Sequence, residues 1–136
     1  MANAIATLEI PASPDQVWQL IGGFNNLPKW LPFIVKSEWE ENGMVRNLTA
    51  ADGANIIERL ESFNYKERTY SYSILKGPAP VENYFATITV KETDKPNVSI
   101  VEWKGSFSPV NVTEAEVVEL YTGIYTDGLN DLKNYF

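Results

Sequence analysis

Apolar and polar residues alternate along most of the chain up to residue 107, and alternation with a period of two is typical of β-strands. The first such run covers residues 3–10. Turn-forming residues separate the later runs, at Asn42-Gly43, Asp52-Gly53, 64–67, 77–80 and 94–97. Because these turns are short, we expect consecutive antiparallel strands at 35–40, 44–50, 55–63, 68–76, 82–92 and 98–107.

Two short helices are predicted between the first strand and the second. Ser13 is placed as an N-cap, and Gln16, three residues later, completes a capping box. Gly22-Gly23 ends this helix. A second helical segment is expected near residues 25–30, and Pro32 limits its length.

The end of the chain changes to the helical period. Thr113 and Glu116 form a second candidate capping box. Beyond them, apolar positions and one glycine recur every three to four residues, at Val117, Tyr121, Ile124, Tyr125, Gly128, Leu132 and Tyr135. This spacing predicts one long amphipathic helix that runs to the C-terminus.

These elements together predict an α+β fold in a single domain over residues 1–136. A seven-stranded antiparallel sheet must cover its apolar face, and the long terminal helix is the element available to do so. If the sheet curves around this helix, a cavity remains between the two. The glycines and aromatic residues of the helix would then line one wall of that cavity.

Composition and charge narrow the possible functions. The chain has 136 residues, carries a formal net charge of −7, and contains neither Cys nor His. The acidic balance argues against nucleic acid as a partner. Without Cys or His there is no thiolate nucleophile, imidazole base or zinc ribbon, so we expect no metal site. Any catalysis must use carboxylates, Tyr, Lys, Arg, hydroxyls or a cofactor. We found no candidate membrane span or signal peptide, and expect a cytoplasmic protein.

Three strands each place one polar residue on the face that carries their apolar residues. Arg46 shares its face with Leu48, Glu58 lies between Ile56 and Leu60, and Tyr84 alternates with Ala86, Ile88 and Val90. Buried charges are costly unless they are paired, so these side chains should pair or meet a polar cavity. Two structural alternatives stay open: an Arg46–Glu58 salt bridge with Tyr84 as a core aromatic residue, or surface exposure of all three.

The order and spacing of several segments resemble the START-like, helix-grip superfamily (SRPBCC), in its polyketide cyclase/dehydrase-like branch. The segments are 11-PASPDQVWQLIGGFNNLPKWLP-32, 43-GMVRNLTAADGANIIERL-60, 70-YSYSILKGPAPVENYFATITV-90 and 101-VEWKGSF-107. Within the superfamily the pattern is similar to lachrymatory factor synthase and, more distantly, to abscisic acid receptors. The resemblance covers nearly the whole chain and implies a hydrophobic ligand cavity between the sheet and the C-terminal helix.

The resemblance also implies site residues. The synthase-like patterns fall on Arg46 in GMVR, Glu58 in ERL and Tyr84 in NYFAT, which become the candidate catalytic residues. The abscisic acid receptors have a mobile Gly/Pro loop over the ligand, and Gly77, Pro78, Ala79 and Pro80 stand in its place as a candidate gate loop. Their ligand-anchoring lysine has no clear counterpart. The expected ligand-binding residues are Arg46, Glu58, Tyr72, Tyr84, Trp103, Phe107, Tyr121 and Tyr125.

Two functions follow from these expectations. In the first, the cavity binds a small hydrophobic molecule and Glu58 exchanges protons with it, in a cofactor-free isomerisation, dehydration or cyclisation. In the second, the same cavity belongs to a non-catalytic carrier of a lipid, polyketide or aromatic metabolite, with Arg46 as its anchor. A protein-interaction domain is a third reading, which only scattered aromatic residues favour. The expected partner is a small hydrophobic molecule, and the chain is expected to be a monomer or a homodimer.

Overall fold

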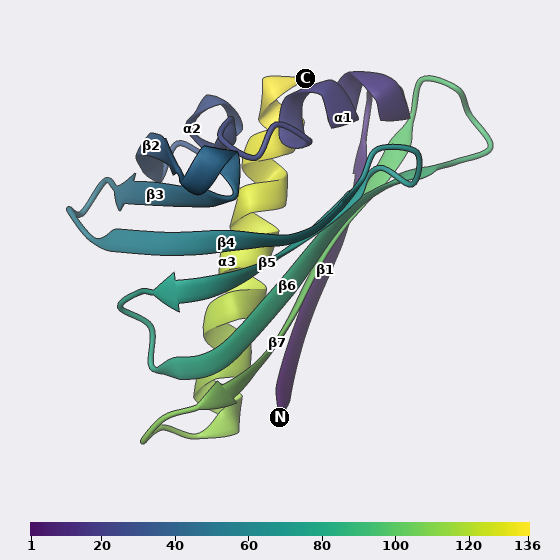
Figure 1. Ribbon diagram of the computed structural model, residues 1–136. Coiled ribbons are helices and arrows are strands. Elements are labelled where there is room, and N and C mark those ends of the chain that lie inside the picture. The colour runs from purple at the N-terminus through teal and green to yellow at the C-terminus, as the bar shows by residue number, and fades with distance from the viewer.

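The computed structural model describes residues 1–136 and has the predicted order of elements (Figure 1). Every predicted strand is present, with boundaries that differ by at most two residues from those expected. The elements are β1 (Ala2–Ile10), α1 (Pro14–Ile21), α2 (Leu27–Trp30), β2 (Ile34–Glu40), the 3₁₀ turn η1 (Glu41–Gly43), β3 (Val45–Ala50), β4 (Asn55–Asn64), β5 (Thr69–Lys76), β6 (Val81–Glu92), β7 (Ser99–Pro109) and α3 (Glu114–Tyr135).

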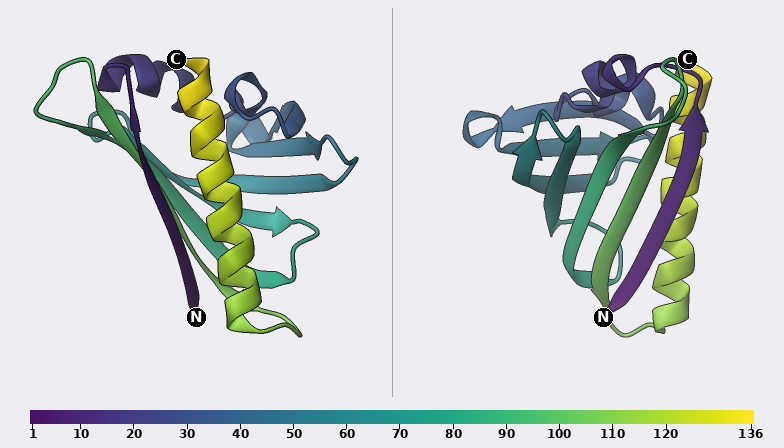
Figure 2. Two further views of the ribbon diagram at one scale, coloured as in Figure 1. Left: turned by 180° about the vertical axis from the view of Figure 1, so that it is seen from behind. Right: turned by 90° about the vertical axis from the view of Figure 1, so that its right-hand side faces the viewer.

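The seven strands form one antiparallel sheet in the order β1-β7-β6-β5-β4-β3-β2. Strands β2 to β7 form a meander in which neighbours in sequence are neighbours in the sheet, and β1 pairs with β7 at the edge of this meander. The helix α3 packs on β1 and β7, while β2, β3 and β4 diverge from it, as Figures 1 and 2 show. The α+β helix-grip arrangement predicted from the sequence is therefore confirmed.

Both predicted helix caps are present, but only one forms the complete capping box. The Ser13 hydroxyl accepts from the Gln16 backbone N–H at 3.2 Å, and the Gln16 side chain accepts from the Ser13 N–H at 3.0 Å. At α3, Thr113 accepts from the Glu116 N–H at 3.1 Å, but Glu116 returns no bond. The prediction at α3 was therefore correct for the Thr113 N-cap but wrong for the hydrogen bond from the Glu116 side chain.

Irregularities in strand pairing bend the sheet where it leaves α3. One residue of β5, Leu75, is left without a partner between the pairs Ile57–Lys76 and Glu58–Ile74. A second bulge interrupts β6 against β7 between Glu82 and Phe85. Bulges increase local twist and bend a strand. These two lie on either side of the 77–80 loop, so the bend opens the sheet beside that loop.

The two halves of α3 differ in how they pack. Near its C-terminal end, a Cβ on Gly128 would lie 2.7 Å from the Trp103 ring, so only glycine permits this close approach. Leu129 and Leu132 are fully buried there. The helical pattern did not include Leu129, which is buried, and it included Tyr135, which is exposed in the structure. The inward face of the helix is therefore rotated slightly from the face that the pattern predicted. No helix, α3 included, is long and apolar enough to cross a membrane.

Candidate functional site

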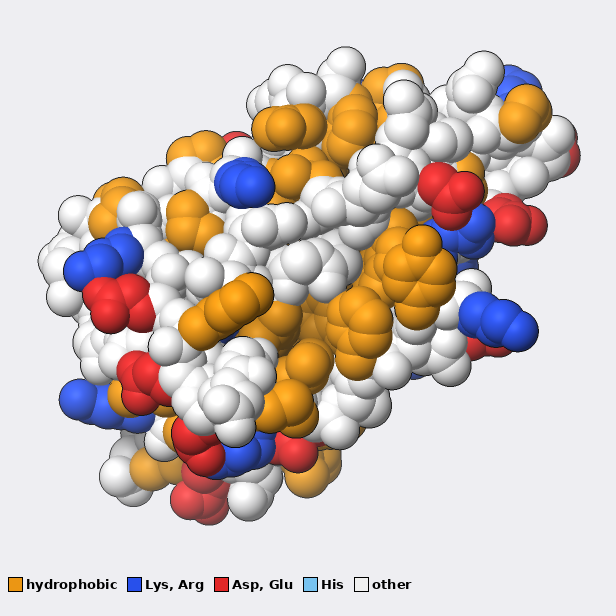
Figure 3. Space-filling model, turned by 45° about the horizontal axis from the view of Figure 1, so that its top comes forward, with side chains coloured by type: hydrophobic (Ala, Val, Ile, Leu, Met, Phe, Trp, Pro, Cys, Tyr) orange, Lys and Arg blue, Asp and Glu red, His pale blue; other side chains and the backbone are white.

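A cavity of about 710 Å³ lies between the bent part of the sheet and the N-terminal half of α3. Seventeen of its 25 lining residues are hydrophobic. Some of them are also exposed, and hydrophobic side chains gather on the face seen in Figure 3. The exposed apolar lining residues are Phe33, Leu75, Pro78, Pro80, Leu120 and Ile124. The volume is in the usual range for small-molecule sites.

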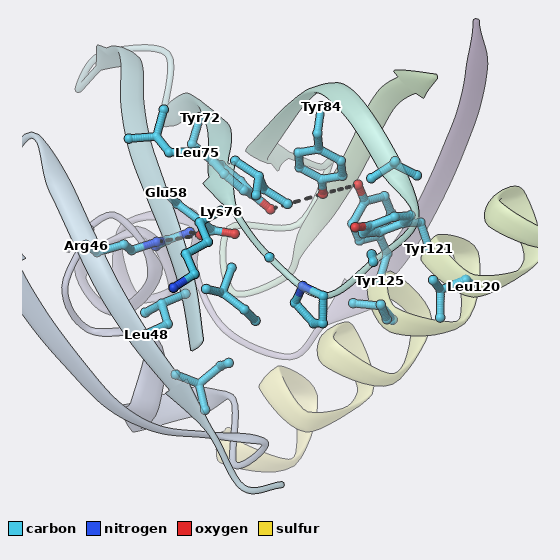
Figure 4. A pocket seen from close by; sticks show the side chains of 18 of the residues that line it. Arg46, Leu48, Glu58, Tyr72, Leu75, Lys76, Tyr84, Leu120, Tyr121 and Tyr125 are labelled. Carbon is cyan, nitrogen blue, oxygen red and sulfur yellow. Dashed lines mark hydrogen bonds and ion pairs between the residues drawn. The ribbon is translucent and has the colours of Figure 1, made fainter. Parts of the chain in front are cut away.

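An ion pair between Arg46 and Glu58 forms one end of the cavity (Figure 4). The two residues are direct partners in the pairing of β3 with β4. The Arg46 Nε donates to Glu58 Oε1 at 2.8 Å, and its Nη2 lies 2.7 Å from the same oxygen. Both contacts therefore use one carboxylate oxygen, and Oε2 accepts no hydrogen bond from the protein.

The remaining contacts of Arg46 fix its guanidinium in place. Its Nη1 donates to the Phe24 carbonyl at 2.8 Å and lies 3.5 Å from the Tyr70 hydroxyl. Its Cζ is 4.1 Å from the centroid of the Phe24 ring and 5.0 Å from that of Tyr72. Only 1% of Arg46 is exposed. The charge of Arg46 is thus satisfied by the protein itself, as the salt-bridge alternative of the sequence analysis expected.

Burial and charge act against one another on the Glu58 carboxyl. Burial in the apolar cavity raises its pKa above the ordinary value, and the nearby Arg46 guanidinium lowers it, with a net upward shift. For Arg46, burial lowers the pKa, but Tyr70, Glu58 and Tyr72 outweigh this and raise it. Glu58 is therefore an acid whose proton affinity is higher than that of an exposed glutamate, beside a permanent cation.

Three tyrosine hydroxyls form the other polar end of the cavity. The Tyr84 hydroxyl makes a short hydrogen bond with that of Tyr125 and lies 3.5 Å from that of Tyr72. The Trp103 indole Nε1 donates to the Tyr72 hydroxyl at 3.1 Å. These residues come from β5, β6, β7 and α3, so the cluster, which we call the tyrosine trio (Tyr72, Tyr84 and Tyr125), ties the helix to the sheet.

Two backbone features place the trio. Asn83 has a positive φ of 54° within the β6 bulge, which leaves Tyr84 facing inward although Glu82 is exposed. Opposite it, a Cβ on Gly105 would collide with the Tyr125 hydroxyl, so the strand needs glycine at this point. Gly105 was a visible signal for a close approach, because it interrupts an otherwise apolar strand pattern.

The cavity keeps these phenols uncharged. Burial raises the pKa of Tyr72 and Tyr84 well above the ordinary value, and it also raises that of Tyr125. Burial raises the pKa of Tyr121, which stands beside the trio, to about 12. At neutral pH these hydroxyls therefore act as neutral hydrogen-bonding groups.

The structure brings most of the proposed ligand-binding residues, and all three proposed catalytic residues, to one cavity. Tyr84 forms no hydrogen bond with Glu58 and belongs to the trio, and the ring of Tyr72 lies between the two ends (Figure 4). Phe107 does not line the cavity; it lies behind Tyr84, with ring centroids 5.9 Å apart. The proposed ligand-binding residues that do line it are Arg46, Glu58, Tyr72, Tyr84, Trp103, Tyr121 and Tyr125.

All four residues of the candidate gate loop, 77–80, also line the cavity. The Pro80 carbonyl accepts from the Val110 N–H at 2.9 Å, which ties this end of the loop to the segment after β7. Gly77 does not have a positive φ, and a Cβ there would make only ordinary contacts, the nearest at 3.4 Å to Ile74. Its backbone conformation thus does not require glycine, and the hinge remains a prediction.

Two charged lining residues, Lys76 and Glu82, were not predicted from the sequence. Lys76 is exposed at the end of β5, and in Figure 4 its side chain projects toward the side of the cavity where Arg46 and Leu48 lie. It forms no ion pair. Its position next to Gly77 in the sequence was the available signal. No cluster of three or more acidic side chains that could hold a metal ion is present.

Comparison with known families identifies one match over the whole chain. The family model described as polyketide cyclase / dehydrase and lipid transport matches residues 1–136. Among curated proteins, MLP-like protein 423 of Arabidopsis thaliana is 25% identical over 113 residues, which cover 74% of this chain and 72% of that protein.

Solved structures give the same fold. XoxI from Bacillus cereus is 55% identical, with a TM-score of 0.97 over 100% of this chain and 96% of that one. A putative uncharacterised protein from Bacillus thuringiensis is 54% identical, with a TM-score of 0.98 over 99% and 98% of the two chains. The di-domain ARO/CYC BexL, at 20% identity and a TM-score of 0.86, matches 98% of this chain with 46% of its own, which is a likeness of fold alone.

Proposed function

The chain belongs to the polyketide cyclase / dehydrase and lipid transport family, and from this premise we propose that its cavity binds a small hydrophobic molecule on which Glu58 acts as a cofactor-free acid–base catalyst. The family supports hydrophobic ligand binding. The finer part of the proposal, proton transfer, depends on the site itself. One observation carries it: Glu58 uses only Oε1 in its ion pair, and Oε2 is unbonded in an apolar cavity.

The proposed roles differ among the three candidate residues. Glu58 takes a proton from the bound molecule and returns it at another atom, which is the step that isomerisation, dehydration and aldol-type cyclisation share. Arg46 is a positioning residue, since its guanidinium is occupied by Glu58 and Phe24 and has no role as a ligand anchor. Tyr84, through the trio, supplies hydrogen bonds to an oxygen of the ligand.

A second candidate function, a non-catalytic carrier, is favoured by the same ion pair. The Arg46–Glu58 contact crosses two neighbouring strands, and Arg46 is fully buried, as expected of a pair that supports the fold. In a carrier, Glu58 would only balance the charge of Arg46. The two candidates therefore differ in whether Glu58 chemistry is needed for function.

Proton exchange on a simple ketone distinguishes the catalytic function from the carrier function. The wild-type protein is incubated with 1-indanone in D₂O, and NMR follows the loss of the hydrogens next to the carbonyl. We expect exchange at least about tenfold faster than in buffer, since a positioned general base contributes 10²–10⁴-fold on a true substrate. Glu58→Gln should return the rate to that of buffer, although it also lowers the free energy of unfolding because it leaves the buried Arg46 charge without its partner.

The matched control is Glu61→Gln, which changes an exposed carboxylate on the outer face of the same strand. It should exchange protons at the wild-type rate. If wild type is no faster than Glu58→Gln while the protein still shifts the 1-indanone resonances, catalysis is refuted and the carrier function stands. If Glu58→Gln unfolds, the ion pair is structural.

A further inference from the structure

The number of hydroxyl hydrogens in the tyrosine trio exceeds the number of bonds available inside it. Three neutral phenols carry three O–H donors, and only two contacts join them, Tyr72 to Tyr84 and Tyr84 to Tyr125. No carbonyl or carboxylate of the protein accepts from any of the three. At least one O–H is therefore left without a protein acceptor, on a wall of the cavity.

Trp103 adds no acceptor to the trio. An indole N–H only donates, so its 3.1 Å bond to Tyr72 uses that oxygen as an acceptor. Either hydroxyl can donate in each of the two contacts, so the hydrogen left for the cavity belongs to Tyr72, Tyr84 or Tyr125, and every arrangement leaves at least one. This end of the site therefore offers a donor, and it carries no charge.

The Glu58 end has the opposite preference. Both Arg46 contacts are made to Glu58 Oε1, and the ion pair is neutral overall. Glu58 Oε2 is therefore free to accept a hydrogen bond. A group that donates a hydrogen bond satisfies this oxygen. An anion would face a carboxylate whose own cation is already paired, and the other cation that lines the cavity, Lys76, is exposed to solvent, which screens its charge.

The two ends are separated by one aromatic ring. The centroid of the Tyr72 ring lies 5.0 Å from Arg46 Cζ and 6.0 Å from the centroid of the Tyr84 ring. A ligand that reaches both polar ends must therefore place its two polar groups on opposite sides of an apolar part about the size of a ring.

We propose that the ligand is an uncharged hydroxyaryl ketone or a molecule of the same design, with a carbonyl-type oxygen facing the tyrosine trio and a hydroxyl-type hydrogen facing Glu58 Oε2. The proposal rests on the ligand-binding part of the proposed function, because it assigns polarity to that cavity. It does not depend on whether Glu58 catalyses a reaction.

Four matched probes test the proposal by calorimetric titration. 4-Hydroxybenzophenone carries both groups, benzophenone lacks the hydroxyl, 4-benzylphenol lacks the carbonyl, and 4-benzoylbenzoate replaces the hydroxyl by an anion. We expect the first to bind tightest. Loss of either group should weaken binding roughly two- to tenfold, the range for one net hydrogen bond. The anion should bind more weakly than benzophenone.

Variants test whether the tyrosine trio binds the carbonyl group of the probe and Glu58 binds its hydroxyl group. Tyr72→Phe/Tyr84→Phe/Tyr125→Phe should remove the preference for 4-hydroxybenzophenone over 4-benzylphenol, whereas Tyr65→Phe, at an exposed tyrosine, should keep it. Glu58→Gln should reduce the preference for 4-hydroxybenzophenone over benzophenone. If the triple variant fails to fold, the wild-type series alone decides.

The outcomes also distinguish this proposal from the proposed function. Equal wild-type affinity for the three uncharged probes would overturn the proposal and leave hydrophobic binding intact. Tight binding of 4-benzoylbenzoate would overturn it as well. If none of the four probes binds, the proposed ligand-binding function fails together with it.

Discussion

The two polar ends of the cavity are built in different ways. Arg46 and Glu58 lie on neighbouring strands, twelve positions apart in sequence, and strand register alone brings them together. Tyr84 and Tyr125 are 41 positions apart in sequence. Their contact requires the β6 bulge, the absence of a side chain at Gly105 and the position of α3 against the sheet. One end is therefore fixed by local pairing, and the other depends on the whole tertiary arrangement.

The chemical consequences of the two ends differ accordingly. A buried ion pair must stay complete, because removal of one partner leaves an uncompensated charge in a medium of low dielectric constant. A hydroxyl cluster tolerates the loss of one member at the cost of about one hydrogen bond. We therefore expect the ion pair to dominate stability and the tyrosine trio to dominate recognition.

The largest expected effect is at the ion pair. Arg46→Met leaves Glu58 buried without its cation and Phe24 without a donor for its carbonyl. The free energy of unfolding should fall by about 3–5 kcal/mol, measured by urea denaturation at pH 7. The double variant Arg46→Met/Glu58→Gln should regain a large part of this loss, since no buried charge remains. A single-variant loss below about 1 kcal/mol would contradict the role given to this end.

Residue pattern predicted the ion-pair end well, for a physical reason. Alternation along β3 and β4 places Arg46 and Glu58 on the apolar face, and the short turn between the strands sets their register. No alternation pattern could place the trio, because Tyr125 reaches Tyr84 only over Gly105, on a third element. The same limit explains the grouping of Tyr84 with Glu58 in the sequence analysis. Both face inward, but they lie on β4 and β6, and β5 lies between these strands.

The next effect is at the glycine beneath the trio. Gly105→Ala puts a Cβ against the Tyr125 hydroxyl, so the tyrosine must move and its bond to Tyr84 is lost. Overpacking of this kind costs about 1–3 kcal/mol in the free energy of unfolding, to be measured by urea denaturation. Tyr125→Phe in the same chain removes the colliding oxygen, so the double variant should be less destabilised than the sum of the two singles. Simple additivity would show that the steric contact is not the cause.

Alkaline pH should weaken the tyrosine end specifically. The pKa of Tyr121 is raised to about 12 by burial, above the ordinary value of 10.0. Between these values the unfolded chain releases the phenolic proton and the folded chain keeps it. Stability is thus fully present below pH 10 and is lost as the pH rises toward 12, by up to about 1.4 kcal/mol per pH unit for this phenol.

Urea denaturation at pH 9, 10 and 11 tests this expectation. Tyr121→Phe should make the pH dependence shallower by the share of one proton, whereas Tyr65→Phe removes an exposed phenol and serves as the control. The raised pKa of the trio members should add to the slope in the wild-type protein. An identical slope in wild type and Tyr121→Phe would mean that Tyr121 ionises alike in the folded and unfolded chains.

The smallest expected effect on stability is at the loop that borders both ends. A Cβ on Gly77 would lie 3.4 Å from Ile74 and 3.8 Å from Ile56, and the backbone there does not need glycine. Gly77→Ala should therefore change the free energy of unfolding by less than about 0.5 kcal/mol. It also restricts the backbone beside Pro78, so a loop that must move to admit the ligand should move more slowly.

Stopped-flow binding and dissociation of 4-hydroxybenzophenone measures that motion. We expect both rates to fall severalfold in Gly77→Ala with little change in affinity, because a hinge alters the barrier and leaves the closed state intact. Gly123→Ala is the matched control: it lies on the exposed face of α3 with nothing near its missing Cβ, and it should keep the wild-type rates. Unchanged rates in Gly77→Ala would mean that the 77–80 loop is a fixed wall of the cavity, which agrees with the hydrogen bond that already ties Pro80 to Val110.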